Sequence, residues 1–164
     1  MNLQPYLSNI FTKAEAKIAA TCARIGDMIP YIPDPETGHY TDTNYLSWWV
    51  NGFWSGVLWQ MHHATGKEIY RTTAAANEER LDQTFHNFVG LHHDVGFMFL
   101  HTAVANFRQT RNEQSRKRGL HAANILAGRY NPSADFIIAW DYDAKGWMIV
   151  DTMMNLPILY WAAQ

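Results

Sequence analysis

The sequence has little that would support several large classes of protein. Cys22 is its only cysteine, which excludes a disulfide framework or a cysteine-based zinc site within one chain. No apolar run approaches the roughly 18 residues that a membrane-spanning helix requires. The formal net charge is only -2, so bulk charge does not favour nucleic acid as a partner. The first residues, MNLQPYLSNIFTKAEAK, lack the basic start and apolar core of a secretory signal.

These absences lead us to expect a soluble cytoplasmic protein with neither nucleic acid nor a membrane as its partner. Several catalytic motifs are absent as well. There is no glycine-rich phosphate loop and no GxSxG elbow, and nothing pairs a serine or Cys22 with a base. What the chain does have is 48% hydrophobic residues and only 17% charged residues, which is typical of a folded domain.

Hydrophobic periodicity predicts helices in which buried and exposed types alternate. Residues 30–38 carry three prolines and a glycine and are expected to form a loop. A small β-hairpin or extended excursion is expected where 136–140 and 147–150 flank a turn at 143–146. The expected helices are an amphipathic one over 7–25, buried ones over 53–63, 95–107 and 153–161, and exposed ones over 68–81 and 113–130.

An internal repeat supports this alternation. GFWSGVLWQMHHATGKEIYR, from Gly52, resembles GFMFLHTAVANFRQTRNEQSR, from Gly96, with a period of about 44 residues. Helical hairpins at this period are typical of an all-α fold, either an α/α toroid or an α-solenoid. A third copy begins near Asp151 and stops at Gln164 inside an apolar stretch. We therefore interpret residues 1–164 as one truncated domain, roughly half of a six-hairpin toroid.

The repeat brings two aspartates into corresponding places. Asp94 and Asp151 each stand just before a buried helix, so in a toroid they would line the same mouth. Two carboxylates at an apolar mouth suit acid/base chemistry, because repulsion and burial raise at least one pKa. The alternative is simple helix capping, since aspartate is a favoured N-cap residue. Pro157 complicates the second site, because the helix either starts near Asn155 or kinks there.

Aromatic and histidine side chains are the other candidates for a site. Trp49 and Trp140 stand next to turns and could provide flat surfaces for sugar rings, whereas core filling is the alternative. His62 or His63, followed by His93-Asp94 and Asp151, imitates the H…HD…D ligand pattern of HD-type metal phosphohydrolases. The basic cluster from Arg111 to Arg118 is interpreted as a solvated outer face.

Four blocks of this sequence resemble glycoside hydrolase family 88, the unsaturated glucuronyl hydrolases. They are WVNGFWSGVLW (49–59), HHDVGFMF (92–99), FIIAW (136–140) and IVDTMMNLPILYWA (149–162). The resemblance implies an (α/α)6 barrel that needs no cofactor or metal ion. It would act on unsaturated disaccharides or oligosaccharides left by polysaccharide lyases. The family hydrates the C4=C5 vinyl ether of the terminal uronate, and the sugar leaves when the resulting hemiketal opens.

The resemblance also implies roles for individual residues. Asp151 matches the family's general acid/base, and Asp94 matches its second essential aspartate. His93, Trp49, Trp140 and Asn51 match positions that line the sugar site. The family domain is more than twice this long, and its second half supplies further site residues. Three hypotheses therefore remain: a hydrolase of this family, an HD-type phosphohydrolase, or a non-catalytic carbohydrate-binding or assembly fragment.

The interpretation as half of a barrel predicts open edges. The helix over 153–161 lacks its next neighbour, so we expect the side chains from Ile158 to Trp161 to be exposed. The helix over 7–25 lacks the hairpin that would close the ring. Such apolar patches exceed what monomers usually leave in water, which predicts self-association or binding of a C-terminal half.

Overall fold

The computed structural model describes residues 3–86, 90–141 and 146–164. Within them no helix is both long enough and apolar enough to cross a membrane. The strands are β1 (Pro30–Pro33), β2 (Tyr40–Asp42), β3 (Tyr130–Asn131) and β4 (Phe136–Ile137). The helices are α1 (Gln4–Ile25), α2 (Asn51–Thr65), α3 (Glu68–Asp82), the 3₁₀ turn η1 (Gln83–His86), α4 (Val95–Phe99), the π-helical η2 (Leu100–Val104), α5 (Ala105–Thr110), α6 (Glu113–Ala127), α7 (Thr152–Asn155) and α8 (Pro157–Ala162).

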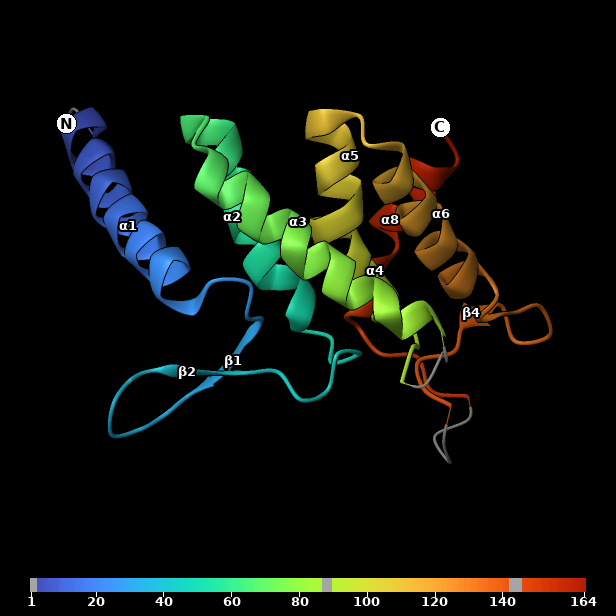
Figure 1. The fold of residues 1–164 in the computed structure, drawn as a ribbon. Helices are drawn as coiled ribbons and strands as arrows, with labels where there is room; N and C mark the ends of the chain where they lie inside the picture. The colour runs from blue at the N-terminus through green and yellow to red at the C-terminus, as the bar shows by residue number, and fades with distance from the viewer. Residues whose placement is uncertain (1–2, 87–89, 142–145) are drawn as a thin grey trace.

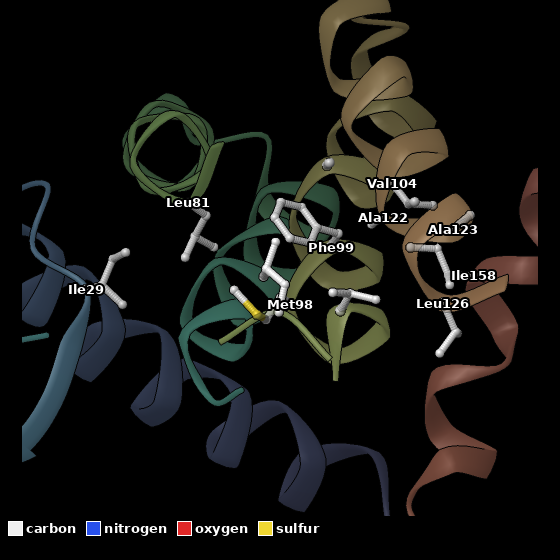
Figure 2. Packing of buried hydrophobic residues seen from close by; sticks show 12 residues of the cluster. Ile29, Leu81, Met98, Phe99, Val104, Ala122, Ala123, Leu126 and Ile158 are labelled. Carbon is white, nitrogen blue, oxygen red and sulfur yellow. The ribbon is translucent and has the colours of Figure 1, made fainter. Parts of the chain in front are cut away.

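The helices form two layers, as the alternation of buried and exposed types predicts. α2 packs beside η2, α3 covers α2, and α6 covers α4, η2 and α8 (Figure 1). The main core lies between the layers, where Met98, Phe99 and Val104 meet side chains from α3, α6 and α8 (Figure 2). The prediction of an all-α fold is thus confirmed.

Glycines at the start of each repeat allow neighbouring buried helices to approach closely. A Cβ atom on Gly52 would stand 2.5 Å from the Phe97 carbonyl oxygen, and one on Gly96 would stand 2.6 Å from the Asn155 Cα. No side chain fits at such distances from backbone, so both positions require glycine. The two glycines occupy the same place in the repeat, and each contacts the next buried helix along the chain.

Two of the predicted buried helices are less regular than their sequences suggest. The run over 95–107 is continuous, but its middle turn, η2, has π-helical hydrogen bonding. The third apolar helix is divided into α7 and α8, and Pro157 begins α8. Proline lacks an N–H and favours the first helical turn, which explains the break. Asp151 is therefore the residue that precedes α7.

The β-structure differs from the prediction. The expected loop over 30–38 contributes to an antiparallel hairpin of β1 and β2. The Asp34 carboxylate closes its turn by accepting from the Glu36 and Thr37 N–H groups. The second hairpin pairs β3 with β4, and residues 147–150 form no strand. Among the described residues, a single backbone hydrogen bond, from the Ala139 N–H to the Trp147 carbonyl oxygen, links the two segments expected to pair. Residues 143–145 of the expected turn lie outside the described residues.

The two ends of the chain differ in how their apolar side chains are covered. Leu3, just before α1, and Tyr6, Leu7, Ile10 and Phe11 in its first turns are exposed. The expectation for the other end is wrong in part, since Ile158 is fully buried and Trp161 is half-buried. The reason is that α8 packs on α6, where a Cβ on Gly119 would meet the Trp161 ring at 2.8 Å. Tyr160 is exposed, as predicted.

The basic cluster on α6 also requires a correction. Arg118 does not lie on a solvated face, because it is buried and pairs with three acidic residues of α3. Its guanidinium donates to Glu78, Glu79 and Asp82 at distances between 2.6 and 2.9 Å. Glu78 is itself fully buried and also accepts from the Asn106 amide. These charges hold the two outer helices together.

Candidate active site

Asp94 and Asp151 each occupy the position just before a short helix, but neither side chain caps that helix. Both carboxylates turn instead to one histidine. The Nε2 atom of His93 lies 3.2 Å from Oδ1 of Asp94 and 3.1 Å from Oδ1 of Asp151. Residues separated by 58 positions in the sequence are thereby brought into contact. The carboxyl groups are well inside the roughly 10 Å at which two acids can act on one sugar ring.

The other ring nitrogen of His93 determines how protons are distributed in this cluster. Nδ1 lies 2.6 Å from the Ala139 carbonyl oxygen, which only accepts, so Nδ1 carries a proton. If Nε2 were unprotonated, its lone pair would face two carboxylate oxygens. A proton must therefore lie either on Nε2 or on one of the carboxyl groups. The cluster of Asp94, His93 and Asp151 is consequently built to hold and move a proton.

The environments of the two carboxyl groups are unequal. Only 9% of the Asp94 side chain is exposed, against 37% of the Asp151 side chain. Burial raises the pKa of the Asp94 carboxyl; the charge of His93 opposes the rise and the Asp151 carboxylate adds to it. His92 stacks on His93, and burial lowers the pKa of His92 to about 4, so His92 is neutral near pH 7. Asp94 thus favours its protonated form more than an ordinary aspartate does.

The raised pKa of Asp94 predicts that this residue costs stability at neutral pH. Between the ordinary and the raised pKa the folded state binds more protons than the unfolded state, so the free energy of unfolding falls as pH rises. We expect Asp94→Asn to raise the Tm at pH 7 and the gain to vanish below about pH 3.9. Thermal unfolding followed by circular dichroism measures this.

The control for this experiment is Asp27→Asn, at an exposed position whose side chain makes no hydrogen bond in the described residues. We expect its Tm to follow that of the wild type at every pH. A Tm for Asp94→Asn that stays below the wild-type value from pH 4 to pH 8 would contradict the prediction.

The two aromatic candidates pack near the start of α4. Trp49 is 36% exposed and packs against Phe97, with ring centroids 5.6 Å apart, and against Phe53. Trp140 is half-buried, and its ring meets the His93 ring edge-on with 5.8 Å between centroids. Trp140 therefore adjoins the carboxylate cluster directly, whereas Trp49 adjoins Phe97, three residues after Asp94.

Asn51 is placed differently from the other candidates. It is 1% exposed, and its Nδ2 donates to the carbonyl oxygens of Tyr45 and Leu46, each at 2.9 Å. Its Oδ1 is buried and has no hydrogen-bond partner in the described part of the chain. The amide thus holds the loop before α2, and a role in binding sugar stays a prediction.

The histidines of the HD-type pattern do not come together. α2 and the α4–α5 run point in the same direction, because Gly52 meets Phe97 and the Trp59 carbonyl accepts from Gln109. His62 and His63 consequently line an open groove of about 820 Å³ at the far end of this layer, away from His93. His92, His93 and Asp94 could hold a metal ion, with ligand atoms within 4.8 Å of one another.

One residue of the site was not predicted. Asn155 is fully buried, and its Nδ2 donates to Asp94 Oδ1 at 3.4 Å and to the Asp151 carbonyl oxygen at 3.2 Å. Its Oδ1 accepts from the Phe97 N–H at 2.7 Å. The signal in the sequence was a polar residue within an otherwise apolar helix segment, four positions after Asp151.

No family model matches the chain. Among curated proteins, it is 36% identical to the unsaturated glucuronyl hydrolase of Bacillus sp. (strain GL1), over 89% of this chain and 40% of that protein. It is 32% identical to the unsaturated chondroitin disaccharide hydrolase of Streptococcus pyogenes serotype M1, over 71% of this chain and 30% of that protein. The chain thus spans about two fifths or less of the length of these relatives.

Solved structures show the same similarity as the curated sequences. The unsaturated glucuronyl hydrolase of Bacillus sp. GL1 matches with a TM-score of 0.83 and 32% identity, over 93% of this chain and 41% of that one. The enzyme from Streptococcus agalactiae matches with a TM-score of 0.78 and 25% identity, over 93% of this chain and 40% of that one. The arrangement of helices is that of the all-α toroids. In sequence and in fold, nearly the whole chain matches part of the unsaturated glucuronyl hydrolases of glycoside hydrolase family 88.

Proposed function

We propose that this chain carries the paired carboxylates of a hydrolase acting on unsaturated uronyl oligosaccharides left by polysaccharide lyases. The observation that carries the proposal is the position of His93 Nε2, 3.2 Å from Asp94 and 3.1 Å from Asp151. The names of the relatives support the substrate class, and one solved neighbour is a complex with dGlcA-Glc-Rha-Glc. In this proposal residues 1–164 form the N-terminal half of an (α/α)6 barrel.

The reaction proposed is hydration of the C4=C5 double bond. Asp151, the more exposed carboxyl group, protonates C4, and its carboxylate then takes a proton from the water that adds to C5. The hemiketal at C5 opens, the remaining sugar leaves, and the unsaturated uronate is released in hydrated form. Asp94 is buried, and its raised pKa favours the protonated carboxyl group. Asp94 exchanges a proton with Asp151 through Nε2 of His93.

The saccharide contacts follow from the same placement. The Trp140 ring, which adjoins His93, and the Trp49 ring offer apolar faces to the C–H surfaces of sugar rings. His93 and Asn51 complete the predicted sugar site. Asn51 acts in this proposal through the loop that it holds in front of α2.

The proposal is tested with an unsaturated chondroitin disaccharide, by following loss of the absorbance of its C4=C5 double bond. The chain is assayed alone and together with a polypeptide that completes the toroid of a relative. Turnover that requires Asp94 and Asp151 supports the proposal. Saccharide binding without turnover in either sample would favour a carbohydrate-binding fragment. Phosphoesterase activity that a chelator abolishes would favour the HD-type hypothesis.

The apolar face of α1 supports a further part of the proposal, that the open edge of the layers is covered by other polypeptide. Leu3, Tyr6, Leu7, Ile10 and Phe11 are each at least 42% exposed and recur at helical spacing. The relatives are more than twice as long as this chain, and the C-terminal half of the toroid is our proposed occupant.

We expect the isolated chain to self-associate through this face at micromolar concentration, because covering apolar area stabilises by about 25 cal/mol per Å². Sedimentation velocity over a concentration series measures the association. Leu7→Lys with Phe11→Lys should give a monomer, whereas Val57→Lys, at an exposed apolar position on α2, should not. A wild-type monomer at every concentration would contradict the expectation.

A further inference from the structure

The side chain of Asn155 connects α7 to α4, the two helices that Asp151 and Asp94 immediately precede. It is the last residue of α7, and none of its surface is exposed. The Phe97 N–H can only donate, so the atom 2.7 Å from it must be the amide oxygen. The amide nitrogen therefore faces Asp94 Oδ1, at 3.4 Å, and the Asp151 carbonyl oxygen, at 3.2 Å. The orientation of the amide is thus determined by its partners.

The close approach of α4 and α7 determines which side chain fits at this position. A Cβ atom on Gly96 would stand 2.5 Å from Asn155 Oδ1 and 2.7 Å from the Asn155 carbonyl oxygen. With glycine at 96 the amide fills the contact, and a longer side chain such as glutamine would not fit. Asparagine is the side chain of this length that both accepts from Phe97 and donates to Asp94.

Asn155 also differs from the other neighbours of Asp94. His93 Nε2 is shared with Asp151, and His92 Nδ1, although 3.4 Å from Asp94 Oδ2, makes no hydrogen bond among the described residues. The amide NH₂ of Asn155 is a donor in every protonation state of the cluster. It therefore supplies a hydrogen bond to Asp94 that does not depend on where the shared proton lies.

We propose that Asn155 is a positioning residue for the paired carboxylates: it sets the distance between α4 and α7 and gives Asp94 a permanent hydrogen-bond donor. The inference rests on the proposed hydration reaction for its kinetic consequences, but not for the contact itself. Because the amide joins the start of α4 to the residue before α7, its loss would move Asp94 relative to Asp151.

Asn155→Asp separates the two functions of the amide. The introduced carboxyl group has the same size and still accepts from the Phe97 N–H, but when ionised it offers Asp94 no donor. We expect kcat in the form that turns over substrate to fall about 10- to 100-fold at neutral pH, with little change in KM. As pH falls the introduced group becomes protonated and donates again, so the ratio of variant to wild-type rate should recover. Steady-state kinetics from pH 5 to pH 8 measure this.

The matched control is Asn77→Ala. Asn77, on α3, is also a fully buried amide, but it donates to the carbonyl oxygen of Asp27, just after α1, at 2.7 Å. We expect Asn77→Ala to lower the Tm and to leave kcat and its pH profile unchanged. If Asn155→Asp keeps the wild-type kcat and pH profile, or shows a loss that is independent of pH, the inference is overturned.

A second measurement needs no turnover and uses the 164-residue chain. If the Asn155 amide donates to Asp94, its side-chain ¹H and ¹⁵N resonances should shift with pH as the cluster ionises. Asp94→Asn should remove that shift, and the Asn77 amide should show none. An Asn155 resonance that does not respond to pH would overturn the inference, whereas a response without turnover in any assembly would overturn only the proposed function.

Discussion

Asp151→Asn is expected to lower the rate at which the unsaturated uronate absorbance is lost by about 10²- to 10⁴-fold, which is the usual contribution of general acid catalysis. The amide has the shape of the carboxyl group and can still form a hydrogen bond with His93 Nε2, 3.1 Å away. It cannot, however, deliver a proton to C4 or take one from water. Because the Asp151 side chain is partly exposed and does not cap α7, we expect the Tm to change little.

The matched control for this variant is Asp141→Asn. Asp141 is an aspartate whose side chain is 68% exposed, against 37% for Asp151, and it pairs with Arg129 at 2.7 Å. We expect this variant to keep the wild-type rate. Both variants are assayed in the form that turns over substrate, whether the chain alone or the completed toroid. Near-normal turnover by Asp151→Asn would show that another group is the acid, and Asp94 would be tested next.

Arg118→Ala is expected to destabilise the chain by about 3–5 kcal/mol, the usual result of removing one partner of a buried ion pair. The guanidinium is 6% exposed and neutralises Glu78, which is fully buried. Without it, the Glu78 carboxylate keeps only the Asn106 amide among its described hydrogen-bond partners. Urea denaturation followed by tryptophan fluorescence measures the loss in the free energy of unfolding.

Arg116→Ala is the control for this prediction. Arg116 stands on the same helix and pairs with Glu113 at 3.9 Å, but both side chains are about half exposed or more. Exposed pairs of this kind contribute roughly 0–1 kcal/mol, so we expect almost no change. If Arg118→Ala unfolds at the same urea concentration as Arg116→Ala, the buried network does not hold α3 and α6 together.

Much of the fold could be predicted because its signals are local. The helix over 68–81 and the two repeats that start at Gly52 and Gly96 each depend on residues close together in sequence. Of the two alternatives for 136–140 and 147–150, the hairpin is not formed, because two short apolar runs can pair with other neighbours. β4 pairs with Tyr130 and Asn131, which immediately follow α6.

For the candidate site, the sequence alone identified Asp94 and Asp151 as corresponding residues before buried helices, but their roles could not be separated from helix capping. Helix capping is excluded by the tertiary structure, in which both side chains turn to His93. The HD-type pattern grouped His62 and His63 with His93 by residue type alone. Because α2 and the α4–α5 run are parallel, His62 and His63 lie at the other end of the layer from His93.

The sequence by itself determined which segments are helical and which faces are apolar, because helix formation and burial follow periodicity and composition over a few turns. Only the tertiary structure decided that His93 lies between two aspartates and that Asn155 faces Asp94, contacts that span about 60 residues. It also decided that Arg118 is buried and that Ile158 is covered by α6. Such contacts depend on how closely backbones approach. Here Gly96 and Gly119 leave room for that approach, and their effect appears only when the helices are packed.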